Sequence, residues 1–99
     1  MLNIEKTIEN GEVTFILKGR LDTASAPKLE EEVKQSASVA NAMIMDFEKV
    51  EYISSAGLRV LLLALKQMRG KGSLKVVHVN DLVREIFDVT GFSNMLTIE

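Results

Sequence analysis

The sequence contains no cysteine among its 99 residues. This absence excludes a disulfide framework and thiolate chemistry, and it is compatible with a reducing cytosol. Long apolar runs are also absent: the longest, residues 60–65, has six residues, whereas a membrane-spanning helix needs roughly 20. The first 15 residues hold no apolar stretch suited to a signal peptide. We therefore expect a soluble, cytoplasmic protein.

Positive charge is not concentrated anywhere in the chain. The net charge is −2, and acidic and basic residues are interspersed. Proteins that bind a phosphate backbone or an anionic membrane usually present a basic patch, so neither nucleic acid nor a membrane is an expected partner. With 46% hydrophobic and 26% charged residues, the composition is that of an ordinary globular domain. We expect residues 1–99 to form one domain with one hydrophobic core.

Histidine is scarce as well, which weighs against several enzyme classes. The single histidine, His78, stands within an expected strand, and no paired histidines or cysteines accompany it, so zinc lacks its usual ligands. A serine hydrolase of the common type needs a G-x-S-x-G turn, but glycine follows the serines of Ile53-Ser-Ser-Ala-Gly57 and does not precede them. Gly70-Lys-Gly-Ser73 follows an expected helix and precedes an expected strand, whereas a phosphate-binding loop follows a strand and precedes a helix. We expect no enzyme activity, metal or cofactor.

The first part of the chain predicts a hairpin and a helix. Strand-like alternation over residues 2–8 and 13–17 is interrupted by Asn10-Gly11, which is a strong hairpin signal. Apolar residues then recur at helical spacing over residues 23–36, with Pro27 in the first turn.

The second part predicts alternating strands and helices. The nearly unbroken apolar run at residues 42–47 is typical of a central strand, and the mostly apolar run 56–69 is typical of a buried helix. The remaining elements are a strand at 74–79, a helix capped by Asn80 or Asp81 and ended by Gly91, and a short strand at 95–98. This order predicts an α/β fold, with helices packed on a mixed sheet whose later strands are parallel.

Two adjacent serines, Ser54 and Ser55, lie between the central strand and the apolar helix. A hydroxyl at a helix start can accept hydrogen bonds from first-turn amides, so capping alone explains a serine here. The small residues Ala56 and Gly57 leave the backbone open to an approaching kinase or partner. A structural and a functional interpretation are both open on these grounds.

The segment 46–63, which contains both serines, resembles the signature of STAS domains of the anti-sigma factor antagonist type. In that signature a strand leads to a phosphorylatable serine and then to Gly-Leu, here Gly57-Leu58. The segment 19–22, followed by Thr23 and Ala24, resembles a second segment of the same family. The predicted order of elements agrees with the STAS fold over essentially the whole chain, so the resemblance implies a single STAS domain with a mixed sheet.

The resemblance assigns roles to particular residues. Ser55 corresponds to the serine that a partner kinase phosphorylates, because it precedes Gly57 by two positions. Ser54 stands where the family often has aspartate, and it is an alternative acceptor. Asp22 matches an acidic residue that lies near the phosphorylation site and contributes to the partner surface; a helix cap is its other interpretation. The implied partner-binding residues are Asp22, Thr23, Ser54, Ser55, Gly57, Leu58 and Arg59.

The function that the resemblance implies is that of an anti-sigma factor antagonist. The unphosphorylated protein binds an anti-sigma factor that is also a serine kinase with a histidine-kinase-like ATPase fold, and a sigma factor is released. Phosphorylation at Ser55 by that kinase, which supplies ATP and Mg²⁺, ends the binding, and a phosphoserine phosphatase restores it. One alternative is a partner-switching regulator of secretion, surface behaviour or a phosphatase. A remote one is a serine hydrolase, for which neither His78 nor nearby carboxylates offer an obvious general base.

Overall fold

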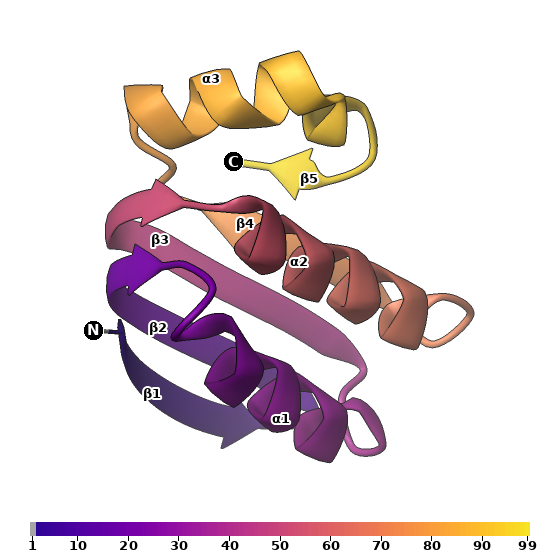
Figure 1. Cartoon of the computed structure of the whole chain (residues 1–99). Helices are drawn as coiled ribbons and strands as arrows, with labels where there is room; N and C mark the ends of the chain where they lie inside the picture. The colour runs from indigo at the N-terminus through magenta and orange to yellow at the C-terminus, as the bar shows by residue number, and fades with distance from the viewer. Residues whose placement is uncertain (1) are drawn as a thin grey trace.

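The computed structural model describes residues 2–99, so Met1, where the expected domain begins, lies outside the described residues. Five strands form one sheet in the order β1-β2-β3-β4-β5. The first two strands pair antiparallel and the later pairs are parallel, which confirms the predicted α/β fold with a mixed sheet (Figure 1). The elements are β1 (Leu2–Glu9), β2 (Glu12–Leu21), α1 (Ala26–Ala37), β3 (Ala42–Ile53), α2 (Ser55–Met68), β4 (Ser73–Val77), α3 (Asp81–Thr90), a 3-10 helix η1 (Phe92–Asn94) and β5 (Thr97–Ile98).

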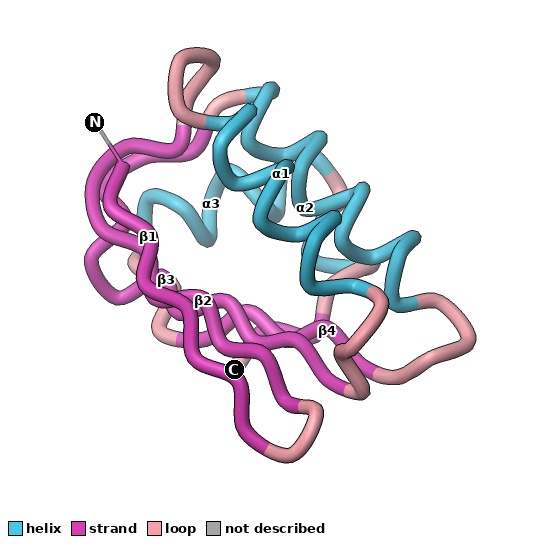
Figure 2. Tube along the Cα trace, turned by 90° about the horizontal axis from the view of Figure 1, so that it is seen from below, coloured by secondary structure: helices cyan, strands magenta, loops and turns pink. Residues whose placement is uncertain are grey.

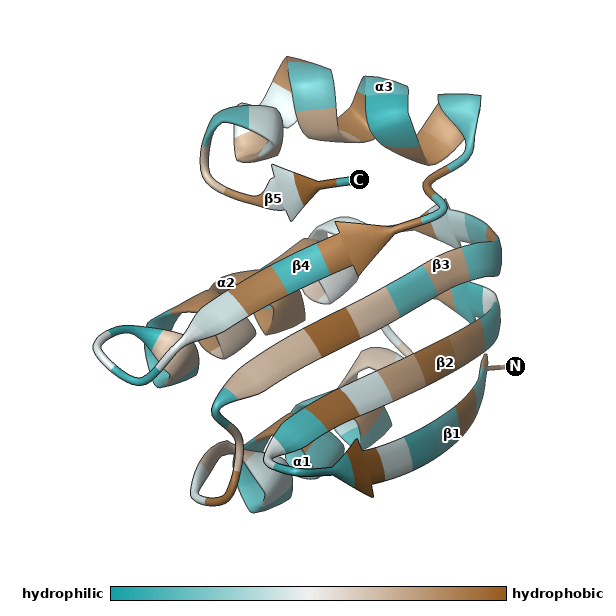
Figure 3. Cartoon of the chain, turned by 180° about the vertical axis from the view of Figure 1, so that it is seen from behind, coloured by the Kyte–Doolittle hydropathy of each residue, from teal (hydrophilic) through white to brown (hydrophobic). Residues whose placement is uncertain are grey.

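The core lies between one face of the sheet and the helices. Helices α1 and α2 lie side by side on that face (Figures 1 and 2). Alternate residues of β2, such as Phe15 and Leu17, are completely buried, whereas Ile16 between them is exposed, as the pleat of a half-covered strand requires. Seen from behind, strands β1 to β4 have no helix in front of them among the described residues (Figure 3). Helix α3 lies at the β5 side of the sheet, where the ring of Phe87 contacts that of Phe47 on β3.

The predicted hairpin between β1 and β2 is confirmed. Asn10 and Gly11 both have positive φ, at 51° and 81°, and Glu9 pairs with Glu12 across the turn. Two consecutive left-handed residues define the turn that matches the twist of paired strands. Asn-Gly is the residue pair that accepts this geometry at least cost, so the local sequence sets the register here.

Several predicted boundaries were wrong. Helix α1 begins at Ala26 and not near residue 23, because Asp22 to Ser25 form a hydrogen-bonded turn. Strand β3 continues beyond residue 47 to Ile53, because its pairing with β2 extends to that end. Strand β4 ends at Val77, which leaves His78 outside the sheet, and β5 spans residues 97–98 only.

Candidate functional site

The ends of β2 and β3 bring the two segments that the sequence singled out to the same edge of the sheet. Leu21 and Ile53 are partners in the parallel ladder, and each is followed at once by a turn into a helix. The amide of Ser54 donates a hydrogen bond to the carbonyl of Leu21 at 2.9 Å. The Asp22 turn and the serine turn are therefore joined through the backbone, at the carboxyl ends of parallel strands, where α/β folds place their binding sites.

Ser54 is the N-cap of α2. Its backbone is extended, with φ −97° and ψ 177°, and its Oγ accepts a hydrogen bond from the amide of Gly57 at 3.4 Å. Its carbonyl accepts the first helical bond, from the amide of Leu58, at 2.9 Å. The side chain is half-buried. The hydroxyl of Ser54 thus satisfies a first-turn amide that would otherwise lack a partner within the helix.

Ser55 is the first residue of α2, and its side chain is exposed. The first turn of α2 carries no acidic residue, so nothing within that turn offsets the partial positive charge of the helix N-terminus. Arg59 lies four positions further along the helix and is also exposed, and residues at this spacing lie on the same helix face. An anion on the Ser55 hydroxyl would meet two favourable charges, the helix terminus and the Arg59 guanidinium.

The Asp22 turn is held by the carboxylate of Asp22 itself. Its Oδ1 accepts hydrogen bonds from the amides of Ala24 and Ser25, both at 3.1 Å, and its carbonyl accepts from the amide of Ala26 at 2.8 Å. The bond from the Ser25 amide is the largest cause of a lowered pKa at Asp22. Asp22 therefore holds the turn that precedes α1 and is not the cap of the helix, because the N-cap of α1 is Ser25 and no side chain caps it. The contribution of Asp22 to a partner surface stays a prediction. The neighbouring Thr23 is exposed.

Gly57 and Leu58 are buried, so their expected place on a contact surface needs revision. A β-carbon added to Gly57 would lie 2.8 Å from side-chain atoms of Ile53 and Leu21 and 3.0 Å from the Leu21 carbonyl oxygen. Gly57 therefore allows α2 to begin against the ends of both strands. Leu58 belongs to the hydrophobic core and reaches the surface only where it lines a groove beside Ser55.

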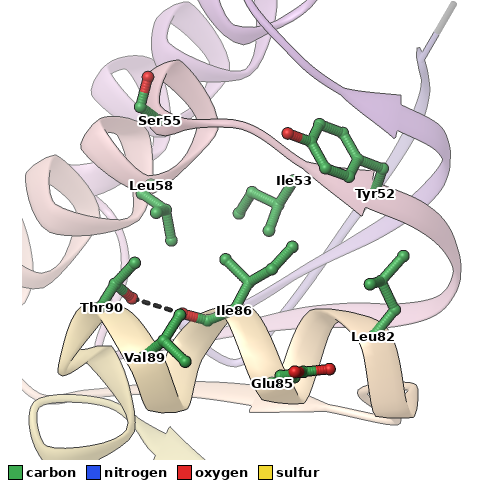
Figure 4. A pocket seen from close by; sticks show the side chains of 9 residues that line it. All are labelled: Tyr52, Ile53, Ser55, Leu58, Leu82, Glu85, Ile86, Val89 and Thr90. Carbon is green, nitrogen blue, oxygen red and sulfur yellow. Dashed lines mark hydrogen bonds between the residues drawn. The ribbon is translucent and has the colours of Figure 1, made fainter.

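This groove lies between the serine turn and α3, and the sequence analysis missed it. Figure 4 shows side chains of the β3 end and of α2 facing those of α3 across it. Its members are Tyr52 and Ile53 from β3, Ser55 and Leu58 from α2, and Leu82, Glu85, Ile86, Val89 and Thr90 from α3. The signal available in the sequence was that α3 has apolar residues on more faces than one buried stripe needs.

The prediction that His78 lies within a strand was wrong. This residue lies beyond the end of β4 with a left-handed backbone, φ 59°, and its Nδ1 lies 3.0 Å from Asp46 Oδ1. This hydrogen bond is the main cause that raises the pKa of His78. Within residues 2–99, no group of three histidine or acidic side chains is arranged to hold a metal ion. None of the helices in this part of the chain has the length and apolar character needed to cross a membrane.

The fold is that of a known family of domains. The STAS domain model matches residues 3–99. BtrV of Bordetella bronchiseptica, assigned as an anti-sigma factor antagonist, is 34% identical over 91 residues, which cover 90% of this chain and 78% of BtrV. The chain belongs to the STAS domain family, among the anti-sigma factor antagonists.

Solved structures agree on the fold. An anti-sigma factor antagonist from Mycobacterium paratuberculosis has a TM-score of 0.90 at 20% identity, and the match covers 99% of this chain and 85% of that one. The antagonist SpoIIAA, solved in unphosphorylated and phosphorylated forms, has TM-scores of 0.78 and 0.77 at 15% and 16% identity. These matches cover 100% of this chain and 87% and 91% of the two SpoIIAA chains.

Proposed function

We propose that this chain is a phosphorylation-switched antagonist that binds an anti-sigma factor when Ser55 is unmodified and releases it when Ser55 is phosphorylated. The anti-sigma factor is also the serine kinase, of a histidine-kinase-like ATPase fold, and its capture frees a sigma factor. A phosphoserine phosphatase resets the switch. The observation that carries this proposal is that the two serines differ: Ser54 caps α2, and Ser55 beside it is exposed.

The choice of Ser55 over Ser54 as acceptor rests on what each hydroxyl already does. Phosphorylation of Ser54 would add a dianion to a half-buried oxygen that accepts a bond from the Gly57 amide, and a kinase would have to open the helix start to reach it. Ser55 can be reached without any change in the backbone. The antagonist SpoIIAA, whose structure is known in a phosphorylated form, has the same fold as this chain.

Phosphorylation of Ser55 is compatible with the folded domain. A phosphate adds about −1.5 to −2 charge at pH 7, and an anion at an exposed helix N-terminus is favourable by about 0.3–1 kcal/mol. The Arg59 guanidinium, four residues along the same face, can pair with the phosphate. The switch therefore acts at the interface, where a bulky dianion meets a surface complementary to a hydroxyl, and where Arg59 is drawn away from the partner. Shifting a complex from mostly bound to mostly free requires about 5 kcal/mol of differential affinity.

A binding module is favoured over a hydrolase because, among the described residues, no histidine lines the groove beside Ser55 and no side chain forms a hydrogen bond with the Ser55 hydroxyl. The ring of His78 bonds to Asp46, and His78 is not among the residues that line the groove next to Ser55. Glu85 does line that groove, but on α3, across from the serine turn (Figure 4). The exposure of Ser55 supports its role as the acceptor of a phosphoryl group from another protein, the kinase, which supplies the chemistry of the transfer.

Two substitutions at Ser55 and two at a distant serine test the switch. The anti-sigma factor that Ser55→Ala captures from the native cell is purified, and its affinity for each variant is measured by calorimetry. We expect Ser55→Ala to bind as tightly as the wild type and Ser55→Asp to bind far more weakly. Ser73→Ala and Ser73→Asp, at an exposed serine that begins β4, should both bind normally. Equal binding by Ser55→Ala and Ser55→Asp would contradict the proposal.

Phosphopeptide mapping after incubation with the kinase and Mg-ATP identifies the acceptor. We expect the phosphate on Ser55 and none on the Ser55→Ala chain; phosphate on Ser54 in the wild type would reverse the assignment. The output is tested on the same captured complex. If the kinase also binds a sigma factor, and if the sigma factor and the Ser55→Ala chain exclude each other from the kinase, the output is transcriptional. A captured kinase without any sigma factor would place the chain in a non-transcriptional switch.

A further inference from the structure

The groove beside Ser55 has an exposed apolar wall. It has a volume of about 490 Å³, and α3 forms one side of it (Figure 4). Leu82 and Val89, which face it from the two ends of α3, are 51% and 77% exposed. Ile86 lies between them and packs partly against the core. Single exposed apolar residues need no explanation, but these three line one hollow together.

The rim of the groove is polar, and the site of modification is part of it. Ser55 stands on the α2 side and Glu85 on the α3 side, and both are exposed. An apolar floor with a few polar groups at its edge is the usual composition of a binding site. Ser55 lines the groove at its α2 edge, although its hydroxyl points away from α3 (Figure 4), so a partner that covers the serine turn lies next to this apolar surface. Glu85 is the charged residue among those that line the groove, and it favours an occupant with a positive charge next to its apolar group.

We propose that this groove receives a large apolar side chain of the anti-sigma factor that binds Ser55, with a lysine or arginine of the same partner facing Glu85. The inference rests on the proposed function and adds the second half of the contact. It also explains how one phosphate has a large effect. A dianion on the rim must lose water when the partner covers the groove, and a burial that leaves a charge unpaired is costly. The phosphate therefore acts against the apolar contact as well as against the direct contact at Ser55.

The test compares matched substitutions of exposed residues in the full chain. The probe is the purified anti-sigma factor captured by Ser55→Ala, and the readout is its Kd for each unphosphorylated variant. We expect Leu82→Ser/Val89→Ser to raise the Kd about tenfold or more. Val39→Ser is the control, because Val39 is 55% exposed and precedes β3 at the opposite end of the sheet; its Kd should stay within about twofold of the wild type. Thermal melting of every variant checks the fold.

A charge test addresses the rim. Glu85→Lys should weaken binding, whereas Glu12→Lys, at the exposed start of β2, should not. An unchanged Kd for Leu82→Ser/Val89→Ser in a folded chain would overturn the groove, even where Ser55→Asp still abolishes binding and so upholds the switch. The oligomeric state is measured as well. If the wild type is a dimer and the double variant is a monomer, the proposal is overturned, because the occupant of the groove is then a second copy of this chain. If Ser55→Asp binds as the wild type does, the switch fails, and the groove is judged by the double variant alone.

Discussion

The amide of Ser54 donates to the carbonyl of Leu21 at 2.9 Å, and this bond joins the two turns of the site. One consequence is that the Asp22 turn and the serine turn are held next to each other by the paired ends of β2 and β3. A partner that contacts both turns meets a surface whose backbone is already ordered. Little conformational entropy remains to be lost there on binding, which favours affinity without new contacts.

The two serines should differ in their effect on stability. Ser54→Ala removes the N-cap of α2, and with a cap bond of 3.4 Å we expect a loss of about 0.5–1 kcal/mol in the free energy of unfolding. Ser55→Ala removes an exposed hydroxyl and should change it by less than about 0.5 kcal/mol. Urea denaturation of both variants measures the difference. A larger loss at Ser55 than at Ser54 would mean that the capping assignment is reversed.

Phosphorylation at Ser55 should not lower the melting temperature. The helix N-terminus and Arg59 both favour the added charge, so we expect the phosphorylated chain to melt at the same temperature as the unmodified chain or slightly above it. Calorimetry of the enzymatically phosphorylated protein, with Arg59→Gln for comparison, tests this. The variant should lose part of any increase. A marked fall in melting temperature would show that the switch works by local unfolding and not at the interface.

In Gly57→Ala, helix propensity and packing are expected to change the free energy of unfolding in opposite directions. Helix propensity alone predicts that alanine stabilises a helical position by about 1 kcal/mol. The added β-carbon, however, would lie 2.8 Å from atoms of Ile53 and Leu21, and overpacking of this kind costs about 1–3 kcal/mol. We expect net destabilisation in chemical denaturation. Stabilisation would mean that the ends of β2 and β3 adjust easily to α2.

The His78–Asp46 pair predicts a pH dependence with a definite sign. Asp46 raises the pKa of His78 in the folded chain, so the folded state binds this proton more tightly than the unfolded state. The pair therefore stabilises the fold fully below the unfolded pKa, about 6.5, and its contribution disappears as the pH rises through the folded pKa.

An NMR titration of the single histidine measures this pKa directly. Asp46→Asn should lower the pKa of His78 toward its ordinary value, while the asparagine oxygen can still accept the bond from the Glu48 amide that Asp46 Oδ1 accepts. Glu48→Gln should lower it by less, because Glu48 acts on His78 only through a weaker charge interaction. An unchanged pKa in Asp46→Asn would contradict the assigned cause.

Local signals in the sequence were sufficient for the hairpin, the order of elements and the position of the serine turn. Asn10-Gly11 fixes its own turn, and Ser54 stands directly before a mostly apolar run of helix length. The length of β3 was underestimated because charged residues interrupt its second half, while its pairing with β2 depends on tertiary contacts. The different roles of Ser54 and Ser55 could not be predicted from residue type either, because they depend on the backbone angles of Ser54.

The groove could not be predicted because periodicity does not say which of two apolar faces a helix buries. Helix α3 has apolar side chains at five positions, Leu82, Val83, Ile86, Phe87 and Val89, of which only Val83 and Phe87 are fully buried. Which of the others face solvent depends on how α3 docks on β3, through the contact of Phe87 with Phe47. The sequence carries the composition of this surface, and only the packing shows its position.

Tyr52 lines the groove, and the Arg20 guanidinium lies 4.8 Å from the centre of its ring. The chain has one tyrosine and no tryptophan. Its fluorescence at wavelengths longer than the emission of phenylalanine therefore comes from a single ring, that of Tyr52, at the edge of the candidate interface. We therefore expect docking at the groove and modification of Ser55 to change the emission of Tyr52, which needs no added label.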